Sequence, residues 1–302
     1  MSGLSPATRP LADPDPALRA IVVVPARDEA ARIGDCLRAL AHQRGVAPAS
    51  YEVIVILDGC RDRTAAVLRA LAAQEPELRV HAVALAPPQG VGRARRHGMD
   101  LACERLLEIG GGEGLIASTD ADSIVAEDWL ACQLALARGG ARAIGGHIEL
   151  HPQEADALTP RAVLEREGRA SERMRALLER TPGDALAEHH QFSGASLALT
   201  ADTYRRCGGL PVRAALEDEA LEHELQARGV PIHRSRSVRV STSARVDGRA
   251  PRGLARDLAR SDWRARRSYT AEEFSLERLL QLKRCSIALV LPAREVLSLI
   301  HI

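Results

Sequence analysis

Two aspartates separated by one residue follow a short apolar stretch in the first half of the sequence. Asp120 and Asp122 come directly after residues 115–118, a pattern that predicts a buried strand. Residues two apart at a strand end face the same way, so the two carboxylates could converge on one hard cation, or on a ribose hydroxyl and a cation together. The alternative is a solvated acidic turn that caps the following helix.

A third carboxylate, Asp58, ends another apolar stretch over residues 51–57. It can accept a hydrogen bond from a nucleobase imide or a ribose hydroxyl, and Gly59 beside it lets backbone approach a ligand closely. The alternative is an ordinary strand-to-helix turn with Asp62 as the N-cap. Both interpretations can hold for different residues.

Glycines and arginines occur together in residues 89–96, Gln-Gly-Val-Gly-Arg-Ala-Arg-Arg. Such a segment at the start of a helix is typical of an anion site, and arginine can bind a diphosphate through two parallel hydrogen bonds. We therefore expect Arg93 and Arg96 to contact a diphosphate. A solvated helix face is the alternative, because neither a phosphate-loop signature nor a full dinucleotide fingerprint is present.

Acidic residues also lie at the start of a helical pattern in the second half of the sequence. The pattern covers residues 216–228, and Glu217 and Asp218 are in its first turn. Either carboxylate could act as a general base for an acceptor hydroxyl, provided it lies within hydrogen-bond reach of the attacking oxygen. Capping of the helix N-terminus is the alternative, because the macrodipole favours negative charge there. The spacing does not choose between the two residues.

The elements that must position these residues alternate between strand and helix. Apolar β-branched runs and helical patterns succeed each other as far as residue 118, which predicts an α/β fold with a mostly parallel central sheet flanked by helices. In such sheets ligands bind at the carboxyl edge, where the acidic residues lie. The expected strands are 20–25, 51–57, 79–85, 115–118, 143–150 and 232–241, and the expected helices include 64–73, 91–109, 156–178 and 216–228.

Composition excludes several classes. A formal net charge of +1 gives no global attraction for nucleic acid. No apolar run reaches the length of a membrane span, so we expect no integral membrane segment. Six scattered cysteines without a Cys-x-x-Cys pair indicate a reducing cytoplasm. Residues 1–19, rich in Pro, Asp and Ala, are predicted to be a disordered leader.

Five motifs occur in an order that resembles family-2 glycosyltransferases over about residues 20–266. The resemblance implies a GT-A fold, a nucleoside-diphosphate sugar as donor, Mg²⁺ or Mn²⁺ as cofactor, and inversion at the anomeric carbon. The motifs are Val24-Pro-Ala-Arg-Asp-Glu29, Leu57-Asp-Gly59, Thr119-Asp-Ala-Asp-Ser123, the Phe192-Ser-Gly-Ala loop and Leu216-Glu-Asp-Glu-Ala220.

The same resemblance implies roles for individual residues. The expected metal ligands are Asp122 and Asp120, and the expected base is Asp218 or Glu217. Two departures stand out: Asp28 occupies a position where asparagine is common, and residues 241–245 offer no histidine to complete the metal shell, for which His233 is a poor substitute. The expected donor-binding residues are Pro25, Arg27, Asp28, Glu29, Asp58, Arg93, Arg96 and Asp120.

The C-terminal part repeats the beginning. Residues 286–295 echo residues 20–28, and residues 269–295 resemble the start of a glucosyl-3-phosphoglycerate synthase. We expect residues 267–302 to be a linker and the truncated start of a second transferase-like domain.

Two other functions fit parts of the pattern. A sugar-nucleotidyltransferase shares the alternating sheet but opens with a glycine-rich loop, where this sequence has Pro25-Ala-Arg-Asp28. A noncatalytic sugar-nucleotide-binding module is compatible with the missing histidine. The acceptor is not identified by the sequence, although the arginines in residues 234–252 could close over donor phosphates or hold an anionic acceptor.

Overall fold

A computed structural model describes residues 11–155, 160–180, 186–213, 216–245 and 258. The chain divides into two compact units. The first comprises Met1–Pro152, Ala185–Ser243 and Arg249–Gly253, and the second comprises the remaining residues. Residues 1–10 and 267–302, with the expected second transferase-like start, lie outside the described part.

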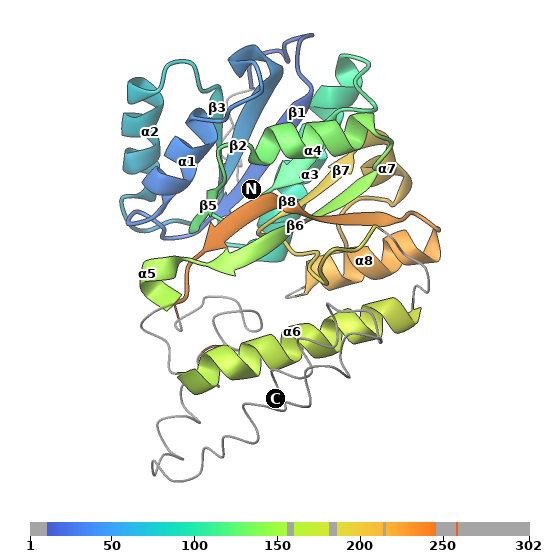
Figure 1. Cartoon of the computed structure of the whole chain (residues 1–302). Coiled ribbons are helices and arrows are strands. Elements are labelled where there is room, and N and C mark those ends of the chain that lie inside the picture. Colours follow the sequence, from blue (N-terminus) through green and yellow to red (C-terminus); the bar gives the residue numbers. More distant parts are fainter. Residues whose placement is uncertain (1–10, 156–159, 181–185, 214–215, 246–257, 259–302) are drawn as a thin grey trace, which may run out of the picture. The chain divides into compact units, whose positions relative to one another are not determined.

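The first unit is built on an eight-stranded sheet with the order β3-β2-β1-β4-β7-β6-β8-β5 (Figure 1). Its first four strands are parallel, as the alternating pattern predicts. They are β1 (Ala20–Ala26), β2 (Tyr51–Asp58), β3 (Val80–Leu85) and β4 (Leu115–Ser118).

Beyond β4 the sheet is mixed rather than parallel. β7 (Leu197–Thr200) lies antiparallel between β4 and β6 (Ala143–Leu150), β8 (Ile232–Thr242) runs parallel to β6, and β5 (Ser123–Val125) pairs antiparallel with β8. Within the described residues, four of the seven strand pairs are parallel, so the expectation of a mostly parallel sheet holds, and the three antiparallel pairs all involve β7 or β5. Short apolar runs of three or four residues show that a strand is buried but not its direction.

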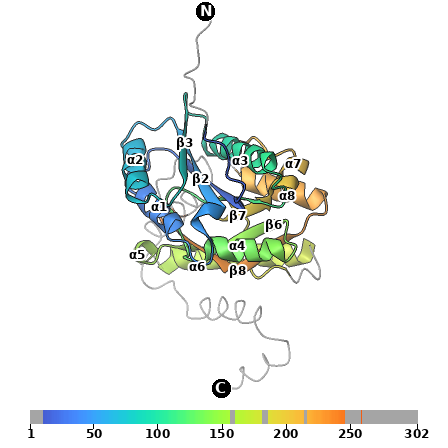
Figure 2. The ribbon, with the colours of Figure 1, turned by 90° about the horizontal axis from the view of Figure 1, so that it is seen from above.

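Helices cover both faces of the sheet because successive strand residues point to opposite sides. Val22 and Val24 pack in one core with residues of α1 (Ile33–Ala41), α2 (Thr64–Gln74) and α4 (Trp129–Arg138). Ile21 and Val23 pack in the other with α3 (Val91–Glu108), α7 (Ala201–Arg206) and α8 (Glu217–Ala227), which lie together in Figure 2. The sequence patterns did not predict the short elements β5, β7, α4 and α7.

Two remaining short elements and one long helix complete the description. A 3₁₀ turn, η1 (Pro48–Ser50), precedes β2, and α5 (Pro152–Ala155) begins at the boundary of the two units. The second unit contains α6 (Pro160–Arg180), close to the helix expected over 156–178, and Leu177 of this helix is buried.

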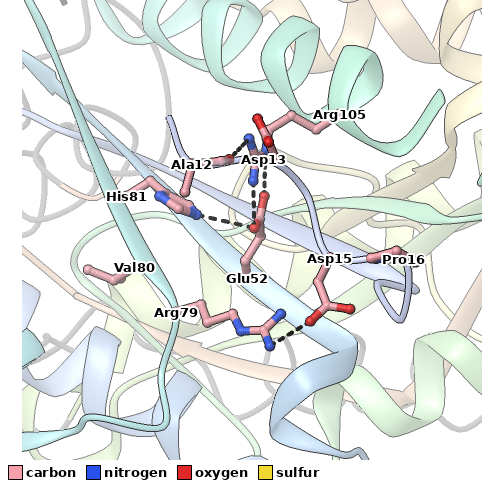
Figure 3. Close-up of a pocket in the computed structure, with 9 residues that line it drawn as sticks. All are labelled: Ala12, Asp13, Asp15, Pro16, Glu52, Arg79, Val80, His81 and Arg105. Atoms are coloured by element: carbon pink, nitrogen blue, oxygen red, sulfur yellow. Dashed lines mark hydrogen bonds and ion pairs between the residues drawn. The ribbon is translucent and has the colours of Figure 1, made fainter. Parts of the chain in front are cut away.

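The described part of the expected leader, residues 11–19, contacts the domain. Leu18 is buried, Ala12 accepts a hydrogen bond from Arg105 Nη1 at 2.7 Å, and Asp15 forms an ion pair with Arg79 at 2.7 Å. Ala12, Asp15, Arg79 and Arg105 line a pocket of about 450 Å³ at the amino ends of β2 and β3 (Figure 3). This pocket lies at the opposite end of the parallel strands from the acidic motifs.

A buried carboxylate organises that end of the sheet. Both oxygens of Glu52 accept hydrogen bonds from Arg105, from Nε at 2.5 Å and from Nη2 at 2.9 Å, and Oε2 also lies 3.1 Å from His81 Nε2. Burial alone would raise the pKa of Glu52, but the hydrogen bonds from His81 and Arg105 and the charge of Arg105 outweigh it and hold the pKa below 4.5. Glu52 is therefore ionised at neutral pH.

We expect Glu52→Gln to lower the free energy of unfolding by about 3 kcal/mol, because removing one partner leaves the buried Arg105 charge uncompensated. Unfolding in urea measures the loss. Asp35→Asn is the control: Asp35 pairs with Arg38 on α1, both side chains are more than half exposed, and the change should stay within about 0.5 kcal/mol.

The stability difference between wild type and Glu52→Gln should also depend on pH. Because folding lowers the pKa of Glu52, the contribution of this carboxylate to the free energy of unfolding is complete above pH 4.5. The contribution declines as the pH falls below that value. An advantage of the wild type that grew on acidification would contradict this assignment.

Candidate active site

Three of the predicted motifs meet at the carboxyl edge of neighbouring strands. Pro25 lies in β1, Asp58 ends β2, and Asp120 follows β4, while the strand order β2-β1-β4 places these ends side by side. The parallel pairing confirms that the acidic motifs share one edge of the sheet.

The segment after β1 is tied to the segment after β2. Asp28, with φ of 51°, accepts a hydrogen bond from the backbone N–H of Arg61 at 2.6 Å, and the Glu29 N–H donates to Thr64 Oγ1 at 2.8 Å. Asp62 Oδ1 accepts from the Thr64 N–H at 2.9 Å, but the N-cap position of α2 is Arg63 and not Asp62, because the helix begins at Thr64. Arg27 is exposed beside this loop.

Asp58 holds the glycine loop at the start of α3. The side chain is 2% exposed, and its two oxygens accept hydrogen bonds from the backbone N–H groups of Gln89 at 2.6 Å and Gly90 at 2.8 Å. Gly59, at φ of 63°, is required here, because a Cβ would stand 2.8 Å from Pro88. Both oxygens of Asp58 are thus engaged by the backbone of this loop, and a contact of Asp58 with a donor stays a prediction.

The interaction at the centre of the edge involves an arginine that the sequence analysis did not single out for donor binding. Arg95 of α3 is buried; its Nε donates to Ser118 Oγ at 3.1 Å, its Nη2 to Asp120 Oδ1 at 2.5 Å, and its Nη1 to Glu217 Oε1. Burial alone would lower the pKa of Arg95, but the charges of Asp120, Glu217 and Asp218 raise it. Arg95 is therefore a permanent cation between two carboxylates.

The neighbouring arginines of α3 have other surroundings. Arg96 Nε pairs with Asp100 at 2.6 Å and its Nη1 donates to the Leu210 carbonyl at 2.6 Å, whereas Arg93 is exposed. Adjacent helical residues point about 100° apart, so a run of arginines does not reveal which one faces the sheet edge. A diphosphate contact of Arg93 or Arg96 stays a prediction.

The two candidate bases differ sharply in environment. Glu217 is buried against Arg95, and its pKa is raised by burial, an effect that Arg95 opposes and Asp218 adds to. Asp218 is half-buried, and its Oδ2 accepts from the Gly194 N–H at 3.1 Å. Leu216 directly precedes them with a left-handed φ of 60°. The structure thus separates two residues that spacing left equivalent.

The loop that contacts Asp218 also packs against Arg95. A Cβ added at Gly194 would fall on the Arg95 guanidinium, far inside the 3.0 Å that real Cβ atoms keep from other atoms. Gly194 therefore allows one segment to contact Arg95 through its Cα and Asp218 through its N–H.

Asp120 and Asp122 lie at a turn that is followed by β5, so they do not cap a helix; α4 begins only at Trp129. The Asp120 side chain is 35% exposed and Asp122 is half-buried. Burial first, and then the charges of both aspartates, raise the pKa of the Cys36 thiol. The two carboxylates therefore act on the same small region.

This donor set fits a divalent cation that is completed by a ligand. Within the described residues, no three or more His, Cys, Asp or Glu side chains gather into a metal cluster, and His233 lies on β8 rather than beside the aspartates. Mg²⁺ is commonly held by one or two carboxylates together with substrate phosphates and water. Asp120 and Asp122 can supply the protein's share.

Of the arginines in residues 234–252 that lie in the described part of the chain, only some are exposed. Arg234 is buried and pairs with Glu222 of α8 at 2.9 Å, and the Arg236 N–H donates to Glu188 at 2.5 Å. An anionic acceptor held by this stretch stays a prediction. Along the described chain, no helix combines the length and apolar character needed to cross a membrane.

Comparison with known proteins identifies the class that this fold and edge define. The model of the family "Glycosyl transferase family 2" matches residues 21–188, more than half of the sequence, and the chain belongs to this family. It is a glycosyltransferase with the GT-A fold. A search of curated proteins found no significant match.

Solved structures support the same fold. One is the mannosyltransferase PcManGT from Pyrobaculum calidifontis, in complex with GDP-Man and Mn²⁺, with a TM-score of 0.54 and 22% identity over 87% of this chain and 69% of that one. Another is TarS of S. aureus in complex with UDP-GlcNAc, with a TM-score of 0.56 and 14% identity over 88% of this chain and 65% of that one. At these identities the likeness shows the fold alone.

We expect Gly194→Ala to lower the free energy of unfolding by about 1–3 kcal/mol, because the added methyl group must displace the buried Arg95 guanidinium. Urea unfolding measures it. Gly34→Ala is the control: its Cβ would stand 3.3 Å from the end of the flexible Arg38 side chain and in ordinary contact with Val67 at 3.7 Å, and alanine is the better helix former. Equal stability of Gly194→Ala and the wild type would show that Arg95 does not occupy this position.

Proposed function

We propose that the protein transfers a sugar from a nucleoside-diphosphate sugar to an acceptor hydroxyl, with a divalent cation and with inversion at the anomeric carbon. The observation that carries this proposal is the convergence of Asp120 and Glu217 on Arg95 at one sheet edge, with Asp122 two residues after Asp120 and Asp218 next to Glu217. The donor would lie over the ends of β1, β2 and β4, where Pro25, Asp28, Glu29 and Asp58 surround its base and ribose.

The neighbours support this class of donor. PcManGT was solved with GDP-Man and Mn²⁺, and TarS with UDP-GlcNAc, so the fold accepts nucleoside-diphosphate sugars in those proteins. Asp122 and Asp120 would hold Mg²⁺ or Mn²⁺, which neutralises charge on the departing diphosphate when bound.

Asp218 is the better candidate for the general base. A base must reach the acceptor oxygen, and Asp218 is half-buried, whereas Glu217 is enclosed and paired with Arg95. In the proposed step the Asp218 carboxylate takes the proton of the acceptor hydroxyl. That oxygen bonds to the anomeric carbon as the bond to the diphosphate breaks, and the nucleoside diphosphate leaves with the bonding electrons.

We also propose a cytoplasmic location, and the free thiols of the cysteines support it. All five cysteines within the described residues are free thiols, which suits a reducing compartment.

Nucleotide binding should depend on the cation. We expect calorimetry with UDP or GDP and Mn²⁺ to give an affinity that falls at least tenfold with chelator and in Asp122→Ala, because two carboxylates and a diphosphate share one cation. Asp128→Ala, an exposed aspartate just beyond β5, is the control and should bind normally. Equal affinity for either nucleotide with and without chelator would overturn the metal assignment.

The base should be separable from donor binding. We expect Asp218→Asn to lower hydrolysis of a UDP- or GDP-sugar by about 10² to 10⁴, because proton transfer to a positioned carboxylate is lost while nucleotide affinity stays within a few-fold. Glu219→Gln, an exposed change in the same helical turn, is the matched control and should leave the rate unchanged. A wild-type rate in Asp218→Asn would place the base elsewhere. Absence of hydrolysis in the wild type, with intact nucleotide binding, would favour a noncatalytic binding module.

A further inference from the structure

We propose that Arg95 is a positioning residue that couples the donor edge of the sheet to the base-bearing helix, so that engagement of Asp120 by a ligand tightens the hold of Arg95 on Glu217 and orders the first turn of α8. The coupling rests on the proposed function, because its input is donor binding. Its output is the position of Asp218, the residue next to Glu217.

Exposure determines the direction in which the coupling runs. The side chains of Arg95 and Glu217 are 4% and 5% exposed, whereas Asp120 is 35% exposed. A ligand that arrives from solvent can therefore touch Asp120 but not the guanidinium or Glu217. Arg95 acts through its neighbours and does not contact the donor.

Charge supplies the physical link. One guanidinium is shared by two carboxylates, Asp120 at 2.5 Å and Glu217, with the charge of Asp218 acting on it as well. When a cation or the hydroxyl donors of a ligand bind Asp120, the attraction of Asp120 for Arg95 weakens. The guanidinium then interacts more strongly with Glu217, and the low dielectric of this buried position preserves that change.

Two contacts connect the Arg95 guanidinium to Asp218, the proposed base. Glu217 and Asp218 are adjacent in the first turn of α8, so a firmer hold on Glu217 restrains Asp218 directly. The other contact is Gly194, whose Cα lies against the guanidinium and whose N–H donates to Asp218 Oδ2 at 3.1 Å. A shift of the guanidinium therefore reaches both contacts that locate the base.

Hydrogen exchange read by mass spectrometry tests the coupling, with UDP or GDP plus Mn²⁺ as the probe. In the wild type we expect slower exchange both at residues 115–123, where the ligand binds, and at residues 216–221, which it does not touch. The change at 216–221 should be about tenfold, a typical coupling between two sites.

Two variants separate coupling from simple packing. Glu217→Gln removes the negative charge that pairs with Arg95. Arg95→Lys replaces the planar guanidinium by a single ammonium group that cannot pair with both carboxylates. In each we expect ligand protection at 115–123 to remain and protection at 216–221 to disappear, with kcat for donor hydrolysis falling more than KM rises. Glu219→Gln, in the same turn but exposed, should keep both responses. If Arg95→Lys fails to fold, Glu217→Gln still gives the answer.

The possible results distinguish a failure of the coupling from a failure of the proposed function. Protection at 216–221 that persists in Glu217→Gln overturns the coupling and leaves the proposed function intact. Loss of protection at 115–123 in Glu217→Gln also overturns it, because Glu217 would then support donor binding itself. If neither nucleotide protects residues 115–123 of the wild type, the proposed donor binding fails and the coupling fails with it.

Discussion

The buried guanidinium of Arg95 is the interaction on which the arrangement of the site depends. Taking an arginine out of water is costly unless its charge and donors are matched, and here Ser118, Asp120 and Glu217 match them. These partners come from the end of β4, the turn after it and the start of α8. One side chain thus joins segments more than 90 residues apart in the sequence.

The position of Arg95 depends in turn on how closely α3 approaches the sheet. Gly98 faces β1 and β2, where a Cβ would collide with Val23 and come within 3.0 Å of Ile56. Polar contacts then locate both ends of the helix: Asp58, at one end of β2, binds the N–H groups of Gln89 and Gly90, and Glu52, near the other end, binds Arg105. Two carboxylates of β2 therefore fix the position of α3 along the strand and the direction of the helix that contains Arg95.

The sequence predicts the part of this architecture that depends on burial pattern. Apolar runs located β1, β2 and β4 within one or two residues, and strand ends located the sheet edge that Asp58 and Asp120 share. It did not predict β7, and a four-residue buried run carries no signal for the direction of a strand. Nor could it distinguish Arg95 from Arg93 and Arg96, because that choice depends on the rotation of α3 against the sheet.

The same limit applies to the acidic pair that opens α8, and here the physical reason also explains the division of labour. In a helix, adjacent side chains point about 100° apart, so one of two neighbouring carboxylates can face the interior while the other faces the edge. Glu217 takes the inner position and compensates Arg95; Asp218 takes the outer one and is held by the Gly194 N–H. Under the proposed function, an ionised base beside a diphosphate site would otherwise add to the negative charge there. The cation of Arg95 beneath the pair reduces that repulsion, so the carboxylates needed for the donor and for the acceptor can share one small region.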